Sequence, residues 1–181
     1  MNRNPRQILT ELLVLRAQGG NDQAFSDLHE LWRADVVRVA QVTVQDRGAA
    51  IEISQDAWIT IARGLGTLRD PACFPRWLFQ IVRRRAADWI RRQQKQRLVV
   101  SRLEAEPRPV SEPSPDAMNS PLAQAIEDLP LAERELITLY YEVGRSVPEI
   151  AEILNVPVGT VKSRLHSVRA RLKSQIEKET S

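Results

Sequence analysis

The stretch Ser146–Lys173, SVPEIAEILNVPVGTVKSRLHSVRARLK, decides the fold because it contains the start and stop signals of two consecutive helices. Ser146 and Glu149 have the spacing of a capping box, in which a hydroxyl and a carboxylate satisfy free amides of a first helical turn. A short apolar run at helical spacing follows, and Asn155 and Pro157 end it. Proline is well placed to open the next helix. The pattern predicts a helix-turn-helix whose second helix is longer and basic.

The second predicted helix has one apolar stripe, and the segment 161–173 contains no acidic residue. At about 100° per residue, the face opposite the stripe presents small polar residues with cations beside them. Such a face suits the major groove of DNA, where cations contact phosphates and central side chains reach base edges. The stripe is Val161, Leu165, Val168, Leu172 and Ile176; the outward residues are Ser163, His166, Ser167 and Ala170, bordered by Thr160 and Lys162, with Arg164, Arg169, Arg171 and Lys173 on the flanks and far end.

A solvated basic face on an ordinary packed helix would also give this pattern. An ordinary helical hairpin seldom combines a capping box, a proline-opened second helix and an outward face without acids. We therefore favour DNA binding.

Composition narrows the class of protein. The chain has 181 residues, 43% of them hydrophobic, and a formal net charge of only +3, so any basic surface that matters must be local. A single cysteine, Cys73, excludes internal disulfides and a cysteine-rich zinc site, and no metal or cofactor is expected. No long apolar run or signal peptide is visible. We expect a cytoplasmic protein without membrane insertion.

The N-terminal half predicts a series of amphipathic helices separated by turn residues. Asn21 or Asp22 is suited to cap the second helix, and Asp46 lies in the turn before the third. The segment 66–73 contains Gly, Asp and Pro and is expected to be a loop too broken for a helix. The expected order is helices at 8–17, from 22 onwards, after the turn at 46–48, and from 74 to about 96.

The helix expected from residue 74 is rich in arginine. Between Arg76 and Arg97 there are eight basic residues and one acid, with Trp77 and Phe79 among them. Aromatic rings and cations together favour single-stranded nucleic acid, because bases stack on rings while charges follow the backbone. The alternative, open for the tryptophans, is that Trp77 and Trp89 are core residues and the arginines a solvated face.

A proline-rich segment divides the chain. Residues 101–121 hold five of the eleven prolines and no aromatic residue, which is typical of a flexible or polyproline-like linker. Helical pattern returns at 122–128, and Pro130 is placed to open another helix, with Leu131, Leu136, Leu139 and Tyr140 expected to face inward. The prediction is an all-α protein of two small helical domains, 1–98 and 122–181, joined by a linker at 99–121.

These motifs resemble a known family. LPLAERELITLYY and the helix-turn-helix stretch are similar to region 4 of bacterial RNA polymerase sigma factors of the sigma-70 family, extracytoplasmic-function type. GNDQAFSDLHELW, QDAW and FPRWLFQIVRRRAADWIRR are similar to region 2. Departures are Ala49, Ala50 and Ile51 in a stretch that is usually acidic, Arg84 where the family often has Asn, and Asp70-Pro71-Ala72 in place of a Gly-Glu-Ser pattern.

The resemblance implies a sigma factor that binds core RNA polymerase, through its β′ clamp helices and β flap, and directs it to promoter DNA. Many relatives are also held by an anti-sigma factor. Region 2 would bind polymerase and melt the −10 element, and region 4 would read the −35 duplex. The implied residues are Glu52, Gln55 and Asp56 for polymerase; Asp70, Arg76, Trp77, Arg83, Arg84 and Arg85 for the −10 strand; and Thr160, Lys162, Ser163, Arg164, His166, Ser167 and Arg171 for the −35 duplex.

Two other classes are open to the sequence. A stand-alone regulator would use the helix-turn-helix alone and would need a dimer seam, but no sustained heptad is present. A nucleic-acid enzyme such as a recombinase would need a metal set or an activated nucleophile. Glu52 and Asp56, four residues apart, could pair on a metal, but no third ligand is apparent.

Overall fold

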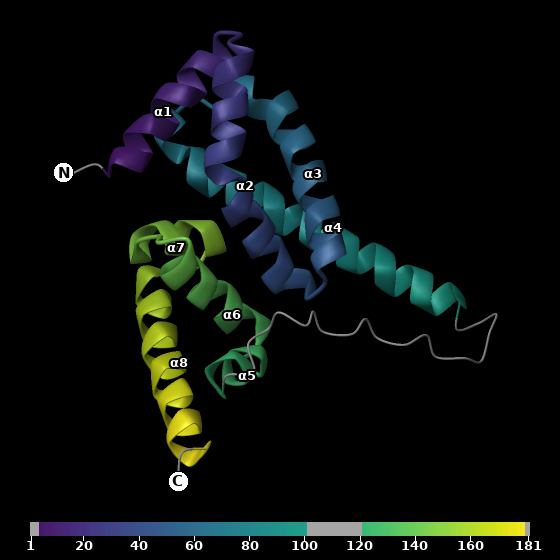
Figure 1. Cartoon of the computed structure of the whole chain (residues 1–181), viewed down its shortest axis with the longest axis vertical. Helices are drawn as coiled ribbons and strands as arrows, with labels where there is room; N and C mark the ends of the chain where they lie inside the picture. The colour runs from purple at the N-terminus through teal and green to yellow at the C-terminus, as the bar shows by residue number, and fades with distance from the viewer. Residues whose placement is uncertain (1–3, 101–120, 180–181) are drawn as a thin grey trace. The chain divides into compact units, whose positions relative to one another are not determined.

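The computed structural model describes residues 4–100 and 121–179, and within them it is helical without a strand (Figure 1). The predicted all-α fold is therefore confirmed. The chain forms two compact units that divide between Ile90 and Arg91, inside α4. Residues 101–120 of the predicted linker lie outside the described residues, and the predicted domain boundaries stay predictions.

The helices of the first unit begin where short polar side chains cap them. Asn4 accepts a hydrogen bond from the Arg6 amide, Asn21 from the Ala24 amide and Asp46 from the Ala49 amide. The predicted turn at 46–48 is therefore shorter than expected, because the cap at Asp46 lets the helix start at the next residue. The elements are α1 (Pro5–Gln18), α2 (Asp22–Val44), α3 (Arg47–Gly64), the 3₁₀ turns η1 (Leu65–Thr67) and η2 (Pro71–Cys73), and α4 (Phe74–Val100).

Trp32 of α2 lies at the centre of the first core. Its side chain is 1% exposed, its indole N–H donates to the Thr10 hydroxyl, and it makes edge contacts with the rings of Phe74 and Phe79. The expectation that Phe79 stands beside Trp77 on a stacking surface is wrong, because Phe79 is 0% exposed. Its ring fills the space against Trp32 and contributes to the core instead.

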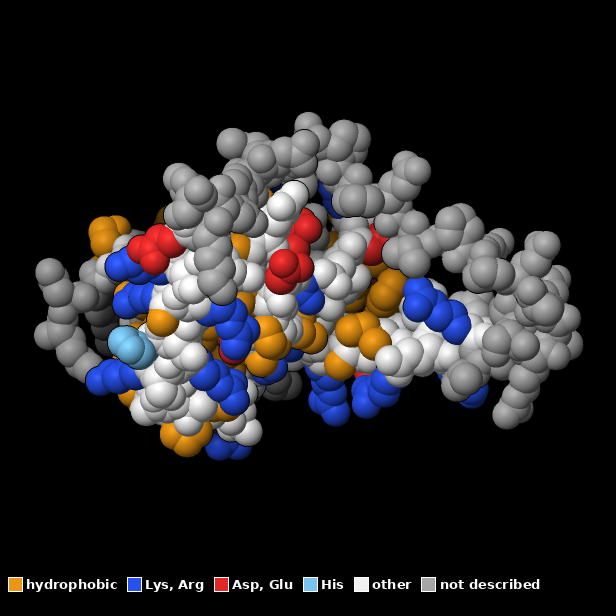
Figure 2. Space-filling view, turned by 90° about the horizontal axis from the view of Figure 1, so that it is seen from below, with side chains coloured by type: hydrophobic (Ala, Val, Ile, Leu, Met, Phe, Trp, Pro, Cys, Tyr) orange, Lys and Arg blue, Asp and Glu red, His pale blue; other side chains and the backbone are white. Residues whose placement is uncertain are grey.

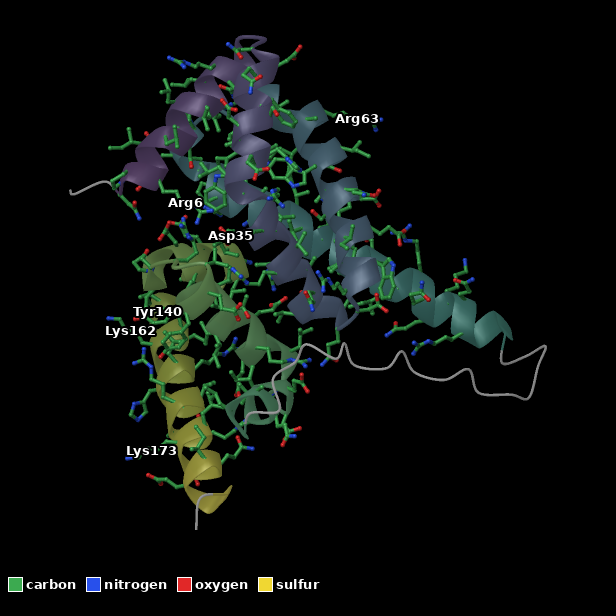
Figure 3. All side chains as sticks on the ribbon, in the orientation of Figure 1. Arg6, Asp35, Arg63, Tyr140, Lys162 and Lys173 are labelled. Carbon is green, nitrogen blue, oxygen red and sulfur yellow. The ribbon has the colours of Figure 1, made fainter. Side chains whose placement is uncertain are left out.

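An ion pair closes the edge of this core. The Arg6 guanidinium lies 4.3 Å above the Trp32 ring and pairs with Asp35, whose side chain is only 9% exposed. Figure 3 labels Arg6 on α1 and Asp35 on α2. The pair joins these two helices, and each charge offsets the burial of the other.

The segment 66–73 is more ordered than the sequence indicates. Two 3₁₀ turns, η1 and η2, occupy most of it. The Gln18 side-chain amide donates to the carbonyls of Leu65 and Leu68 at 2.9 and 2.8 Å, and Asp70 caps η2 by accepting from the Ala72 amide. These contacts give a Gly- and Pro-containing segment a fixed path, which local sequence pattern does not show.

In the second unit, α8 (Val158–Glu179) packs against three other helices. Its residues Val161, Leu165 and Val168 are buried as predicted and Leu172 is partly buried, but Ile176, expected in the same stripe, is 36% exposed near the end of the helix. Leu131 was expected to face inward, which is wrong: it is 38% exposed at the first position of α6, whereas Leu136 and Leu139 are buried as expected. The other elements are α5 (Pro121–Glu127), α6 (Leu131–Ile137), the π-helical turn η3 (Thr138–Glu142) and α7 (Val147–Leu154).

The predicted helix-turn-helix is confirmed in detail. The Ser146 hydroxyl accepts from the Glu149 amide, and the Glu149 carboxylate accepts from the Ser146 amide at 2.8 Å. Asn155 ends α7 in the left-handed region with φ of 55°, a conformation that asparagine tolerates. The Pro157 carbonyl then accepts from the first free amides of α8, so the tight turn is fixed on both sides.

Candidate nucleic-acid interface

The outward face of α8 is arranged as the helical wheel predicts. Ser163, His166, Ser167 and Ala170 are all exposed, and Lys162 is exposed beside them. Figure 2 shows Lys and Arg side chains grouped around one histidine. The Ser163 hydroxyl donates to the Thr160 carbonyl at 3.1 Å, which leaves the hydroxyl oxygen able to accept from a ligand. Short side chains at the centre leave room for base edges to approach.

One flank of α8 carries Arg164 and Arg171, both expected to contact DNA. Arg164 is half-buried. The Arg171 guanidinium donates to the Glu133 carboxylate of α6 at 2.9 Å, so part of its charge is neutralised within the unit. Arg171 therefore joins α8 to α6 in this structure.

The other flank of α8 contains a contact that the sequence analysis missed. The Arg169 Nε–H donates to the Tyr141 hydroxyl at 2.7 Å. The guanidinium carbon lies 5.5 Å from the Tyr140 ring centroid and 5.7 Å from that of Tyr141, within cation–π range. The hydrogen bond that Arg169 donates to Tyr141 is the main cause of a pKa of Arg169 above its ordinary value. The two tyrosines come from η3, 28 residues away for the bonded one, so only the tertiary structure brings them together.

The start of α4 holds the residues expected to contact single-stranded DNA, and they differ in availability. Arg76 and Arg84 are exposed. Trp77 is half-buried, 6.2 Å from the Phe74 ring centroid, and a Cβ built on Gly64 would come within 3.1 Å of its ring. One edge of the indole therefore rests on a glycine of α3 while part of the side chain stays accessible.

Two further residues of this predicted set have partners inside the unit. The Arg85 guanidinium donates to the Thr60 hydroxyl at 2.8 Å and so joins α4 to α3. Asp70 is exposed but uses one carboxylate oxygen to cap η2. Arg83 is half-buried. By exposure alone, Arg76 and Arg84 are the most accessible arginines of the set, and Trp77 is half-buried between them in sequence.

The outward face of α3 combines polar and apolar side chains. Glu52 and Gln55 are exposed, and Asp56 is half-buried. Ile51 and Ile59 are 44% and 51% exposed, and with Gln55 they follow one face at steps of four residues. In the sequence, the signal for this surface is the presence of two isoleucines at outward helix positions, which a search for charged residues does not find. No group of three or more His, Cys, Asp or Glu residues able to hold a metal occurs in the described parts of the chain, so Glu52 and Asp56 lack a third ligand there.

Comparison with family models gives the family. A model described as Sigma-70 region 2 matches residues 28–96, which contain α3, η1, η2 and most of α4, and one described as Sigma-70, region 4 matches residues 120–172, which contain the helix-turn-helix. The chain belongs to the sigma-70 family. Both matched regions carry the surfaces described above, in the order that the resemblance implies. The protein is therefore a sigma factor that directs initiation at promoters, and the stand-alone regulator is set aside.

Individual relatives place this sigma factor in the extracytoplasmic-function type. It is 29% identical over 184 residues to the ECF RNA polymerase sigma-E factor of Escherichia coli (strain K12), covering 94% of this chain and 96% of that protein. It is 28% identical over 172 residues to a probable RNA polymerase sigma factor, RfaY, of Xanthomonas campestris, covering 88% of this chain. The matched part is 42% of the Xanthomonas protein, so the chain spans less than half of that relative's length.

Solved structures agree with the fold of this sigma factor. CnrH, in complex with the cytosolic domain of CnrY, matches with a TM-score of 0.69 and 24% identity over 94% of this chain and 98% of that one. The sigma factor RpoE of Bartonella quintana, in complex with the anti-sigma factor NepR, matches with a TM-score of 0.63 and 20% identity over 83% of this chain and 97% of that one. At these identities the likeness concerns fold alone. No helix in the described segments is both long and apolar enough to cross a membrane.

Proposed function

We propose that this sigma factor binds core RNA polymerase through the outward face of α3, reads the −35 duplex with α8, and captures a melted −10 strand at the start of α4. The exposed face of α8 is the observation that carries the proposal, since small polar side chains lie at its centre and cations beside them. Polymerase would supply the chemistry of RNA synthesis, and the sigma factor would supply sequence recognition. Because promoter DNA lies in the bacterial cytoplasm, we place its action there.

On α8, position and residue type indicate which side chains contact bases and which contact phosphates. The central serines and His166 reach base edges, while Lys162 and Arg164 at the borders contact phosphates on either side. Phosphate contacts fix the register of the helix, and base contacts give it specificity. A salt-dependent affinity with sequence discrimination is the expected behaviour.

On α4, the same reasoning indicates the side chains that would contact the melted strand. Arg76 and Arg84 are exposed cations, and Trp77 offers part of its indole between them. A base that leaves the duplex loses stacking energy, which a ring contact replaces in part. η1 and η2 precede this surface; Gln18 holds the carbonyls of Leu65 and Leu68, and Asp70 caps η2.

On α3, Gln55 and the exposed Ile51 and Ile59 would form the central contact to polymerase, with Glu52 and Asp56 at its edge. Apolar side chains surrounded by polar ones are typical of protein interfaces. The surface has few charges, so the isoleucines are expected to contribute more than the acids.

An anti-sigma factor is a further proposed partner. One structure of similar fold holds the sigma factor RpoE with the anti-sigma factor NepR, and another holds CnrH with the cytosolic domain of CnrY. In this chain α1 leaves apolar side chains exposed, which is typical of a surface that another protein covers. Isolation of the chain from its host, followed by mass spectrometry of any stoichiometric companion, tests this partner. The exposed apolar residues are Ile8, Leu9, Leu12 and Leu15.

Reconstitution with core polymerase tests the function directly. The chain is added in stoichiometric amount to core enzyme and genomic DNA fragments, and run-off transcripts are sequenced. Defined start sites that depend on the chain are expected, with shared −35 and −10 elements upstream. Transcripts without common elements, or no association with core enzyme, would reject the proposal.

The −35 assignment makes a specific prediction. Changing Lys162→Glu and Arg164→Glu together should lower holoenzyme affinity for promoter duplex and reduce the salt slope by about 2, because two phosphate contacts are lost. Filter binding at several salt concentrations measures both quantities. The control is Arg16→Glu with Arg33→Glu, which changes net charge equally on exposed residues of α1 and α2. Equal losses in both variants would show that net charge, and not this face, determines binding.

A further inference from the structure

Four side chains form a column along one flank of α8. Lys162, His166, Arg169 and Lys173 follow one another at steps of four, three and four residues and are all exposed. At 1.5 Å per residue the column is about 16 Å long. In Figure 3, Tyr140, Lys162 and Lys173 lie along the same side of α8. The Arg169 contact with η3 is in the middle of this column.

Arg169 is held in one orientation, unlike the lysines beside it. Its Nε–H donates to the Tyr141 hydroxyl at 2.7 Å, and its guanidinium lies close to both tyrosine rings. The side chain is exposed, and Tyr141 is 56% exposed. Arginine has four more N–H donors on its terminal nitrogens, and among the described residues the hydrogen bond of Arg169 uses only Nε–H. Tyr141 therefore fixes Nε of Arg169, and the two terminal nitrogens can still donate to a ligand.

A comparison with Arg171 shows why this matters. Arg171 bonds to the Glu133 carboxylate, which offsets its charge. Arg169 bonds to a neutral hydroxyl, so its full positive charge remains. The tyrosine hydroxyl accepts from Arg169 and can still donate its own proton to an acceptor. A cation and a hydroxyl donor that lie 2.7 Å apart and face solvent together form a two-point anion site.

We propose that Arg169, positioned by Tyr141, binds a backbone phosphate of promoter DNA and thereby sets the register of α8 in the groove. This rests on the proposed function. At 100° per residue, Arg169 lies on the flank of α8, about 120° from the centre of the outward face. When the outward face lies in a groove, this flank faces the wall of the groove. Base edges are read by the central residues, and the flank meets phosphates. Tyr141 restricts the arginine before binding, so less conformational entropy is lost when the phosphate is bound.

Holoenzyme reconstituted with the full chain tests this. The probe is a promoter duplex that wild-type holoenzyme enriches from a random-sequence library, and affinity is measured against salt. Arg169→Ala should reduce the salt slope by about 1. Tyr141→Phe keeps the ring and the charge, so affinity should fall about threefold to tenfold with the slope unchanged. Arg169→Lys should keep the slope and lose affinity, because lysine lacks the planar fork.

Controls separate this role from a structural one. Arg134→Ala removes one cation from α6 and should leave the slope unchanged. Helical circular dichroism and the discrimination between the selected promoter and single-base variants should be the same in all four variants, since a phosphate contact carries no sequence information.

Each contrary result has one meaning. If wild-type holoenzyme binds the promoter and Arg169→Ala leaves the slope unchanged, the phosphate role is wrong and the proposed function stands. If Arg169→Ala weakens association with core polymerase and not with DNA, the pair is a protein contact and the inference is overturned. If wild-type holoenzyme selects no sequence, the proposed function itself fails.

Discussion

At the scale of single residues, Trp77 and Phe79 show how packing separates aromatic side chains that are close in sequence. The apolar stripe expected on α4 consists of Phe74, Leu78, Ile81, Val82 and Trp89. Trp77 and Phe79 both lie about 100° from the middle of this stripe, on opposite sides. Phe79 is fully buried against Trp32, whereas Trp77 rests on Gly64 and stays half-exposed. One is therefore a core residue, and the other is available to a base.

Substitution of each residue should give a different defect. Phe79→Ala removes a buried ring and should lower the free energy of unfolding by about 3–5 kcal/mol. Trp77→Ala should cost less stability and slow promoter opening more than it weakens the closed complex. Urea unfolding followed by tryptophan emission measures stability, since all four tryptophans lie in the first unit. Permanganate reactivity of unpaired thymines measures opening.

Phe74→Leu is a control for Trp77→Ala, because it replaces the buried Phe74 ring and keeps the half-buried Trp77 indole. It should affect stability and leave the ratio of open to closed complexes at the wild-type value. If Trp77→Ala reduces both complexes equally, Trp77 is a packing residue only.

At the scale of elements, the start of α7 depends on a network wider than the capping box. Glu149 accepts from the Ser146 amide at 2.8 Å and from the Arg145 guanidinium at 3.2 Å, and Arg145 is only 9% exposed. Ser146→Ala should destabilise α7 by about 1 kcal/mol through loss of the cap. Glu149→Ala should cost more, because it also removes the ion pair with the buried Arg145.

Hydrogen exchange of the α7 amides measures both losses within one element. Glu149→Gln is the matched control, since its side chain still accepts from Ser146 but has no charge for Arg145; its loss should lie between the other two. If Ser146→Ala and Glu149→Ala speed exchange equally, the Arg145 contact contributes nothing to stability.

The elements that could be predicted are those whose signals are local. The capping box, the helix end at Asn155 and the buried part of the α8 stripe each depend on residues within a few positions and appear as expected, whereas Ile176 at the end of the stripe is exposed. η1 could not be predicted, because Gln18 holds the carbonyls of Leu65 and Leu68 from 47 and 50 residues away. The Arg169–Tyr141 contact could not be predicted either, because the two residues are 28 positions apart. For the site, residue type and the exposed face of α8 were predictable, while the internal partners of Arg171, Arg85 and Asp70 were not.

At the scale of the whole molecule, the protein has two compact units, each with a core of its own. The proposed function needs both on one chain. When the first unit has bound its element, the second is already at high effective concentration near its own, and this raises overall affinity by about 100- to 10,000-fold without any new contact. The physical connection is then as necessary as either surface.

Cleavage of the chain within the predicted linker tests this dependence. A protease site placed within residues 101–120 should allow both units to keep their helical circular dichroism and tryptophan emission after cutting, because no described core residue is removed. Promoter-specific run-off transcription should nevertheless fall at least 100-fold. The uncut chain with the same insertion is the control and should transcribe like the wild type. Full activity after complete cleavage would mean that the two units hold together without a covalent link, and effective concentration would then play no part in promoter selection.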